Sequence, residues 1–219
     1  WVTRLPDGLD AHHATALGTP GLTAALAVES LAQALPDLNG AEVAVSGATG
    51  GVGCLAVALL AARGCKVSAI SGKPSADAFL TAIGASEGLT RDQVVDSSGR
   101  NLLPPRWSAA VDVAGGAMLS ALIRQLRDGG AVAATGNAGD TTFDANVLPF
   151  ILRGVSLLGI NTETATPSHI AELWRHLAGP GKPACLDRLY QVVALSDLPD
   201  MLTRIMAGDI LGRVVVDLG

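Results

Sequence analysis

Short apolar runs and longer stretches with helical spacing follow one another along most of the chain. The short runs are predicted as strands at residues 42–46, 66–70, 87–89, 109–113, 131–134 and 155–160. Helices are predicted between them, at residues 22–35, 54–63, 76–83, 118–126, 147–152 and 167–177. Strands that alternate with helices are typical of a parallel sheet covered on both faces. The sequence therefore predicts an α/β fold with a doubly wound, six-stranded parallel sheet.

The two ends of the chain follow other patterns. Trp1–Leu5 is expected to be extended, and Asp10 is expected to cap a short helix that Gly18–Gly21 breaks. Residues 91–105 lack periodicity, which predicts a loop with one helical turn. The tail is predicted as a strand, a helix and a strand at residues 190–195, 198–206 and 213–218.

A glycine-rich turn joins the first of the six strands to the helix after it. Within this turn, Ala48-x-Gly50-x-x-Gly53 fits the dinucleotide-binding fingerprint of Rossmann folds. Small residues let a pyrophosphate approach the backbone, and amides at the helix start would point at the phosphates. The predicted phosphate-binding residues are Ala48, Thr49, Gly50, Gly51, Val52 and Gly53. The alternative is a tight turn that needs glycines for packing alone.

The residues after the second strand bear on which dinucleotide binds. NAD-specific sites usually carry Asp or Glu there, and its carboxylate accepts hydrogen bonds from the adenosine ribose. Here the chain reads Ser71-Gly72-Lys73, and a hydroxyl, a free amide and a cation suit a 2′-phosphate instead. Arg91 could stack on adenine or add a second cation. The sequence therefore favours NADP(H) over NAD(H), with a solvated turn as the alternative.

Composition and charge narrow the class of protein. Hydrophobic residues make up 49% and charged residues 16%, as expected for a sheet covered on both faces. The net charge of −5 argues against nucleic acid as a partner, and no apolar run reaches the roughly 18 residues of a membrane helix. Cys54, Cys65 and Cys185 share no CxxC spacing, so we expect reduced thiols, a cytoplasmic protein and no zinc site.

Five motifs in a fixed order resemble a known family. They are Gly18-Thr-Pro-Gly-Leu-Thr-Ala24, Ser46-Gly-Ala-Thr-Gly-Gly-Val-Gly53, Ser71-Gly-Lys73, Trp107-Ser-Ala-Ala-Val-Asp-Val-Ala-Gly-Gly116 and Pro149-Phe-Ile-Leu-Arg-Gly-Val-Ser-Leu-Leu-Gly-Ile160. Together they resemble the zinc-free quinone oxidoreductase branch of the medium-chain dehydrogenase/reductases, and most of all its acrylyl-CoA reductase group. The resemblance implies a metal-free, NADPH-dependent reduction of the α,β double bond of a small enoyl-CoA.

The resemblance also implies roles for matching positions. Thr49–Val52 would hold the pyrophosphate, Ser71–Lys73 the 2′-phosphate and Arg91 the adenosine end of the coenzyme. Further implied contacts are Thr19, Asn137, Ile151 and Thr162 around the nicotinamide half, and Arg213 in the tail. Two motifs depart from the family pattern near the reacting ring. The chain has Thr135-Gly-Asn-Ala-Gly139 in place of Cys-Gly-Leu-Ala-Gly, and Asn161-Thr162 in place of Asp-Ser.

Family members carry an N-terminal GroES-like barrel that supplies much of the substrate pocket, and this sequence lacks most of it. Since the chain starts at Trp1, we expect a piece of something longer, or a processed protein. The expected parts are the end of the catalytic domain with a connecting helix, the NADP-binding Rossmann domain and a return to the catalytic domain, at residues 1–20, 21–182 and 183–219. The missing barrel lies outside this sequence, or another polypeptide supplies it, or the substrate site is rebuilt.

No side chain stands out as a general acid, so the sequence leaves the catalytic residues unknown. His12, His13, His169 and His176 fall on predicted helices, whereas ligands of such sheets bind at the carboxyl ends of the strands. We expect these histidines to be exposed or satisfied by hydrogen bonds. Asp112 ends the fourth strand, where a capping role is as plausible as a coenzyme contact.

Three functional hypotheses follow. The first is the enoyl-CoA reductase, and the second is a quinone or aldehyde reductase or the enoyl reductase segment of a polyketide or fatty-acid synthase. The third is a sensor or scaffold module that binds NADPH without catalysis. Relatives dimerise through the edge strand that is here residues 155–160, and its apolar sequence favours self-pairing. We therefore expect a homodimer with a continuous sheet.

Overall fold

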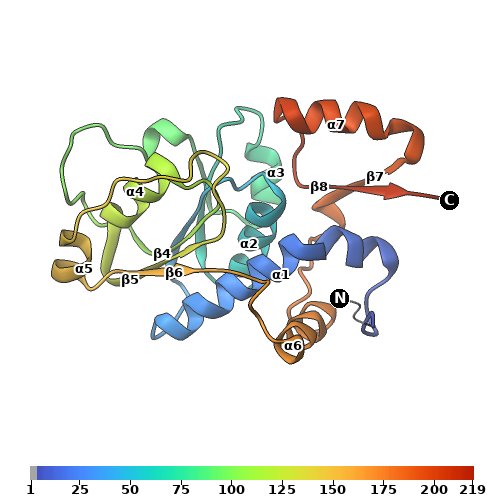
Figure 1. Ribbon diagram of the computed structural model, residues 1–219, viewed down its shortest axis with the longest axis horizontal. Coiled ribbons are helices and arrows are strands. Elements are labelled where there is room, and N and C mark those ends of the chain that lie inside the picture. Colours follow the sequence, from blue (N-terminus) through green and yellow to red (C-terminus); the bar gives the residue numbers. More distant parts are fainter. Residues whose placement is uncertain (1–3) are drawn as a thin grey trace.

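The computed structural model describes residues 4–219, and a six-stranded parallel sheet lies at its centre (Figure 1). The strands run in the order β3-β2-β1-β4-β5-β6, and every neighbouring pair is parallel. Their bounds are β1 Glu42–Val45, β2 Lys66–Ile70, β3 Glu87–Leu89, β4 Trp107–Asp112, β5 Leu126–Ala134 and β6 Ser156–Gly159. This order is that of a doubly wound Rossmann sheet, which confirms the predicted fold class.

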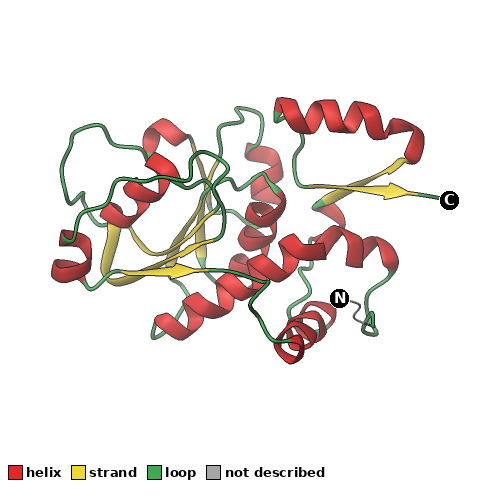
Figure 2. Cartoon of the chain, in the orientation of Figure 1, coloured by secondary structure: helices red, strands yellow, loops and turns green. Residues whose placement is uncertain are grey.

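Helices cover both faces of the sheet (Figure 2). They are α1 Ala11–Ala34, α2 Gly51–Ala62, α3 Asp77–Ala82, α4 Gly116–Gln125, α5 Leu148–Arg153 and α6 Pro167–Ala178. Val43 and Val45 of β1 pack in one apolar cluster with α1, α2 and α6, whereas Ala44 packs in a second cluster with α4. Because both faces are buried, the inner strands are almost wholly apolar.

The first helix has the predicted cap and the predicted interruption. Asp10 caps it as expected, because the carboxylate accepts a hydrogen bond of 2.7 Å from the amide of His13. The break expected at Gly18–Gly21 is also present, as a kink at the non-helical Gly18 between the two halves of α1. Gly18 takes φ 46° and ψ −153°, which turns the chain, and Pro20 then stands in the first turn of the second half. A proline is tolerated there because an amide in that position has no helical partner.

Two strands begin earlier than predicted. β4 starts at Trp107 rather than at residue 109, and β5 starts at Leu126 rather than at residue 131, directly after α4. Trp107 pairs with Leu126, and the register shifts before Ala109 pairs with Ala131. Because the residues between these two pairs are mostly polar, the pattern of apolar positions does not indicate where β5 starts.

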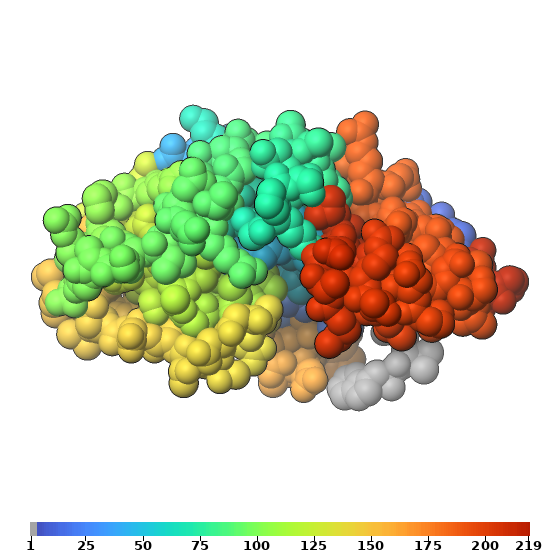
Figure 3. All heavy atoms as spheres, turned by 90° about the horizontal axis from the view of Figure 1, so that it is seen from above, coloured from blue at the N-terminus to red at the C-terminus, as the bar shows by residue number. Residues whose placement is uncertain are grey.

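The last part of the chain forms the predicted strand, helix and strand: β7 Tyr190–Ala194, α7 Leu198–Ala207 and β8 Arg213–Asp217. β7 and β8 pair in parallel, in a two-stranded sheet separate from the central one. Figure 3 shows this C-terminal lobe in red, beside the rest of the molecule. The expected boundaries after residues 20 and 182 stay predictions, and residues 1–3 of the expected extended stretch lie outside the described residues.

Candidate functional site

A cleft of about 730 Å³ opens at the carboxyl ends of β1, β2 and β4. Its walls come from the turns after these strands, the loop after β5 and the end of α7. The lining residues are Ser46, Gly47, Thr49, Gly50, Ile70, Ser71, Gly72, Lys73, Arg91, Val95, Val113, Ala114, Gly115, Gly116, Ala117, Met118, Ala138, Gly139, Asp140, Ala207 and Gly208. Doubly wound sheets bind their ligands at this edge.

The glycine-rich turn after β1 forms one wall of the cleft. Gly47 takes φ +57°, and the amide of Gly50 donates to the carbonyl of Gly47 at 2.9 Å, which closes the turn. A Cβ on Gly53 would lie 2.2 Å from the same carbonyl oxygen, so a glycine is required at that position. The N-terminus of α2 therefore packs directly on the turn. Its first amides, which have no partner within the helix, are available to an anion in the cleft.

Two buried hydroxyls mark the wall between β1 and β2. Thr49 Oγ1 lies 3.4 Å from Ser71 Oγ, although the two residues are far apart in sequence. Ser71 Oγ also accepts a hydrogen bond of 3.1 Å from the backbone amide of Lys73. The turn after β2 is therefore braced by its own serine, and this serine lines the cleft.

Two cations stand at the same end of the cleft. The Lys73 ammonium donates to the carbonyl oxygen of Ile210. Burial lowers the pKa of Lys73, and the nearby Asp209 carboxylate opposes that shift. The Arg91 guanidinium lies over Gly72, where a Cβ would come within 3.2 Å of Arg91 Cζ. Among the described lining residues, the one carboxylate is Asp140, on the loop after β5.

Asp112 acts as a buried brace. Its carboxylate accepts hydrogen bonds from Ser46 Oγ at 2.6 Å and from the amide of Gly115 at 2.8 Å. Burial raises the pKa of this carboxyl, while the hydrogen bonds from Ser46 and the amides lower it. The side chain thus ties the end of β1 to the turn before α4. This geometry favours the capping role, because the fully buried carboxylate is absent from the cleft lining.

The structure brings six of the predicted coenzyme residues into the cleft wall: Thr49, Gly50, Ser71, Gly72, Lys73 and Arg91. Four more, Ala48, Gly51, Val52 and Gly53, belong to the same turn and the first turn of α2 behind that wall. Arg213 lies at the other side of that helix end, where a Cβ on Gly51 would come within 3.2 Å of Arg213 Nη1. Arg213 Nε donates to the carbonyl of Ala16 at 3.0 Å, and burial lowers the pKa of its guanidinium.

The residues predicted around the nicotinamide half are more scattered. Thr19 follows the kink of α1 and is exposed, and Asn137 is exposed directly before the lining residue Ala138. Ile151 lies on α5 with 68% of its surface exposed. Thr162 is half-buried in the loop after β6. None of these four side chains lines the cleft, so their roles stay predictions.

Other lining residues were missed from the sequence. Gly115 and Gly116 both take positive φ in the turn between β4 and α4, and a Cβ on Gly115 would lie 2.3 Å from the carbonyl of Asp140. The Gly-Gly pair that begins two residues after the end of a predicted strand is the signal that could have identified this wall. Gly208, at the end of α7, gives no comparable signal, because its place in the cleft depends on how the C-terminal lobe docks.

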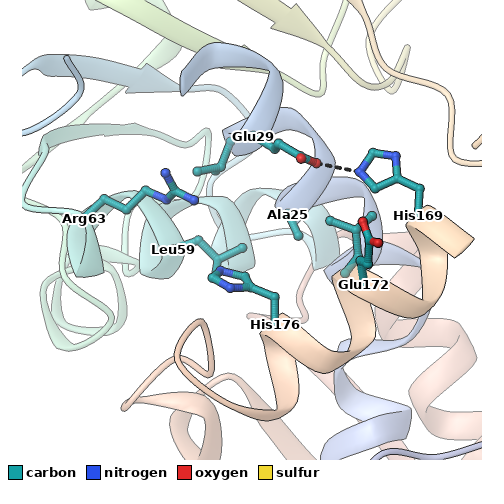
Figure 4. A pocket seen from close by; sticks show the side chains of 9 residues that line it. Ala25, Glu29, Leu59, Arg63, His169, Glu172 and His176 are labelled. Carbon is teal, nitrogen blue, oxygen red and sulfur yellow. Dashed lines mark hydrogen bonds and ion pairs between the residues drawn. The ribbon is translucent and has the colours of Figure 1, made fainter. Parts of the chain in front are cut away.

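A second, smaller cavity of about 230 Å³ lies between α1, α2 and α6 (Figure 4). His169 Nε2 and Glu29 Oε2 lie 2.7 Å apart across it. At the start of α1, His13 Nε2 lies 2.7 Å from Asp187 Oδ1. Both histidines are paired with carboxylates outside the cleft, which confirms the expectation that they are satisfied by hydrogen bonds.

Two further observations concern residues 4–219. No group of three or more His, Cys, Asp or Glu side chains in that range could hold a metal ion. None of the helices there is long and apolar enough to span a lipid bilayer. Zinc independence and the cytoplasmic location both stay predictions.

Comparison with known proteins identifies the family. The profile of the family described as zinc-binding dehydrogenase matches residues 51–179, from the start of α2 to the end of α6. The chain therefore belongs to the zinc-binding dehydrogenase family. This assignment agrees with the predicted membership of the medium-chain dehydrogenase/reductases.

Curated relatives lie in the predicted branch. The chain is 39% identical over 218 residues to acrylyl-CoA reductase AcuI of Ruegeria pomeroyi, an alignment that covers 100% of the chain and 66% of that protein. It is 39% identical over 222 residues to the putative quinone oxidoreductase YhfP of Bacillus subtilis, again covering 100% and 66%. The chain thus spans a little less than two thirds of the length of these relatives.

Solved structures agree with this assignment. The chain resembles the crystal structure of Escherichia coli YhdH with bound NADPH, with a TM-score of 0.93 and 37% identity over 100% of the chain and 67% of that structure. It resembles Bacillus subtilis YhfP with bound NAD equally well, with a TM-score of 0.93 and 39% identity over the same shares.

Proposed function

We propose that the cleft binds NADPH and that the protein reduces the α,β double bond of a small enoyl-CoA, as an oxidoreductase of the acrylyl-CoA reductase type. One observation carries the coenzyme assignment. The turn after β2 places the Ser71 hydroxyl and the Lys73 ammonium at the cleft wall, and the Arg91 guanidinium joins them from the turn after β3. A 2′-phosphate needs these donors, whereas a free ribose hydroxyl is usually bound by a carboxylate at this position.

The residues of the cleft fit a dinucleotide. Gly50 stands at the N-terminus of α2, where it leaves the backbone open to a pyrophosphate, and the helix amides and dipole stabilise the negative charge. The Arg213 guanidinium, beside Gly51, adds a positive charge behind the same group. Escherichia coli YhdH, whose crystal structure contains bound NADPH, shares this fold with a TM-score of 0.93.

The nicotinamide coenzyme supplies the hydride when it is bound. The chain's own part is to orient the ring and to keep the acceptor close to it. Asn137, Thr162 and Thr19 are proposed to enclose the ring, because they come from the loop after β5, from the loop after β6 and from the kink of α1. Ile151 does not join them, because α5 lies beside the start of β5, where Arg153 donates to the carbonyl of Leu126. The sequence and the described residues name no proton donor, so the substrate pocket of the longer relatives is the proposed source of that group.

A second candidate reaction is the reduction of a quinone or aldehyde by the same coenzyme. The observation in its favour is the name of the Bacillus subtilis relative, putative quinone oxidoreductase, at 39% identity. The two reactions share the cleft and differ in the acceptor. A third possibility, an NADPH-binding module without catalysis, gives the same coenzyme affinity without turnover.

The coenzyme assignment is tested by titration of the chain with NADPH and NADH, followed by calorimetry. We expect NADPH to bind at least tenfold more tightly, because the phosphate makes charge-assisted hydrogen bonds worth about 1.5–3 kcal/mol each. Lys73→Met keeps the apolar part of the side chain and removes the charge, so most of the preference should disappear. Arg127→Met, in an exposed ion pair with Glu42 far from the cleft, is the matched control and should leave both affinities unchanged. Equal affinities in the wild type would contradict the phosphate site.

The reaction is tested by turnover of acrylyl-CoA and of a quinone with NADPH. Both are assayed for the chain alone and for the chain extended by the N-terminal third of its relatives. Faster oxidation of NADPH with acrylyl-CoA supports the enoyl reductase, and faster oxidation with the quinone supports the second candidate. Coenzyme binding without turnover in the extended protein would support the third hypothesis, a module that binds NADPH without catalysis.

We also propose that two copies pair through β6. This strand is the edge of the central sheet, and Leu157 within it is 38% exposed. An exposed apolar edge strand favours pairing with a second copy. Light scattering should give a dimer, and Leu157→Lys should shift the protein towards the monomer. Val192→Lys on β7, an exposed strand of the other sheet, is the control that should leave the mass unchanged. A monomeric wild type at micromolar concentration would contradict this proposal.

A further inference from the structure

Lys73 is held in place by a part of the chain far from its own turn. Its ammonium donates to the carbonyl oxygen of Ile210, in the segment 208–212 that connects α7 to β8. We name this segment the return loop. The backbone amide of Lys73 is fixed at its other end, because it donates to Ser71 Oγ at 3.1 Å. Both the backbone amide and the side-chain ammonium of Lys73 are therefore held by hydrogen bonds within the protein itself.

The return loop is itself fixed on the glycine-rich turn. The amide of Gly212 donates to the carbonyl of Thr49 at 2.9 Å. Gly212 takes φ +72°, and a Cβ there would lie 2.3 Å from the carbonyl oxygen of Leu189. The side chain of Ile210 is buried, with 8% of its surface exposed. The carbonyl that receives the Lys73 ammonium thus belongs to a segment with little freedom to move.

These contacts bear on how well Lys73 can bind a phosphate. A lysine ammonium has three N–H donors, and one hydrogen bond to a carbonyl leaves two for a ligand. The carbonyl is neutral, so the positive charge of the ammonium is retained. A free lysine loses rotamer freedom when it binds a phosphate, whereas a side chain that is already ordered loses less.

We propose that the return loop positions Lys73 for the 2′-phosphate of NADPH and thereby sets the preference for NADPH over NADH. The proposal rests on the coenzyme assignment made above and adds a determinant that lies outside the fingerprint and outside the turn after β2. Lys73 is the residue that contacts the phosphate. Ile210 and Gly212 act through it as positioning residues.

The test displaces the loop without touching Lys73. Gly212→Ala introduces a side chain where φ is positive and where the Leu189 carbonyl is too close, so the loop must shift. The matched control is Gly154→Ala, which places the same strain at φ +61° after α5, with no atom within 4 Å of the new Cβ. The readout is the ratio of the dissociation constants for NADH and NADPH. We expect Gly212→Ala to lower this ratio by about tenfold, which corresponds to 1.4 kcal/mol, and Gly154→Ala to leave it unchanged.

A double-mutant cycle separates positioning from general damage. If the loop acts through Lys73, then Gly212→Ala has no further effect on the ratio once Lys73→Met is present. A purely structural role would weaken NADH and NADPH by equal factors, so the ratio would stay at the wild-type value. That result, in a protein whose wild type does prefer NADPH, overturns the positioning proposal and leaves the coenzyme assignment intact. A wild type without preference overturns both.

A measurement on the wild type covers the case in which Gly212→Ala does not fold. Amide hydrogen exchange is followed across residues 208–213 with saturating NADPH and with saturating NADH. A lysine that bridges the loop carbonyl and the phosphate should slow exchange in this segment more with NADPH than with NADH. Equal protection by the two coenzymes would contradict the proposal.

Discussion

The central sheet and the C-terminal lobe differ in how much apolar surface each of them buries. Val43, Ala110 and Val132, on three neighbouring strands of the sheet, have no exposed surface. In the lobe, Val192 of β7 is 46% exposed and Met206 of α7 is 88% exposed. A sheet covered on both faces is stable through its own packing, whereas a two-stranded sheet with an open face needs further contacts. The lobe is held to the rest of the molecule at its base, by buried apolar residues such as Leu189 and Val215 and by the hydrogen bonds of the return loop.

This difference in burial also bears on where the candidate site lies. The turns at the carboxyl ends of the sheet are rigid because they rest on the packed core, and they can present amides to an anion without rearrangement. The lobe adds single groups to that frame, among them the Ile210 carbonyl and the Arg213 guanidinium. Substitutions in the two regions should therefore differ in their effect on stability. The three predictions below are ordered by the size of that effect, with the greatest first.

The largest effect is expected from Gly53→Ala in α2. The new Cβ would meet the backbone of Gly47 at 2.2 Å, and backbone atoms cannot move aside as the end of a side chain can. We expect a loss of about 3 kcal/mol in the free energy of unfolding, from urea denaturation, together with weaker NADPH binding. Gly51→Ala in the same helix is the control, because its Cβ meets the flexible Arg213 side chain and the Pro20 ring. Equal losses in the two variants would show that the close approach of α2 to the turn is unimportant.

An intermediate effect is expected within α7. Met201 is 7% exposed and its sulfur lies 3.9 Å from Gln191 Nε2 of β7, whereas Met206, five residues later, is 88% exposed. Met201→Ala should lower the free energy of unfolding by about 2 kcal/mol, and Met206→Ala should change it by less than about 0.5 kcal/mol. Urea denaturation of both variants measures this. A large loss from Met206→Ala would mean that the exposed face of α7 is covered in solution, for example by a second copy.

The smallest effect is a pH dependence due to Asp112. Burial raises the pKa of its carboxyl above the ordinary value of 3.8, so the folded protein holds this proton more tightly than the unfolded chain does. Its contribution to stability is fully present below pH 3.8 and is lost as the pH rises through the raised pKa. The difference in unfolding free energy between the wild type and Asp112→Asn should therefore fall as the pH rises through that window.

Asp96→Asn provides the control of opposite sign. Hydrogen bonds from Ser98 hold the pKa of Asp96 below its ordinary value, so its contribution is present above pH 3.8 and is lost as the pH falls. The two difference curves should thus slope in opposite directions. A flat curve for Asp112 would mean that burial and the hydrogen bonds from Ser46 cancel.

The sequence predicted the parts of the site that depend on local order. A strand, a glycine-rich turn and a helix in succession were enough to predict that Gly50 and Gly53 lie in or beside the turn at the cleft. Each of these glycines makes a close contact with a residue only a few positions away in the sequence. Ser71 and Lys73 were found in the same way, since they directly follow a predicted strand. The six strands and the unit at the end of the chain were also predicted, with errors at the starts of β4 and β5.

Contacts between distant backbone atoms could not be predicted from the sequence. Nothing in the residue pattern indicates that the carbonyl of Ile210 receives the ammonium of Lys73, because every residue carries a carbonyl. How the two halves of α1 continue after the interruption at Gly18 could not be predicted for a related reason. A glycine and a proline weaken a helix locally, and only the packing of α1 against α2 and the sheet decides whether the two halves stay together.

The parallel pairing of β7 with β8 has a consequence for the charge beside the start of α2. Tyr190 is paired with Arg213, and the amide of Arg213 donates to the carbonyl of Leu189 at 2.8 Å. Successive side chains of a strand point to opposite faces, so a slip of one residue would turn the guanidinium away from the end of α2. The alignment of two short strands thus aims a half-buried cation, and an error in that alignment would misdirect the charge.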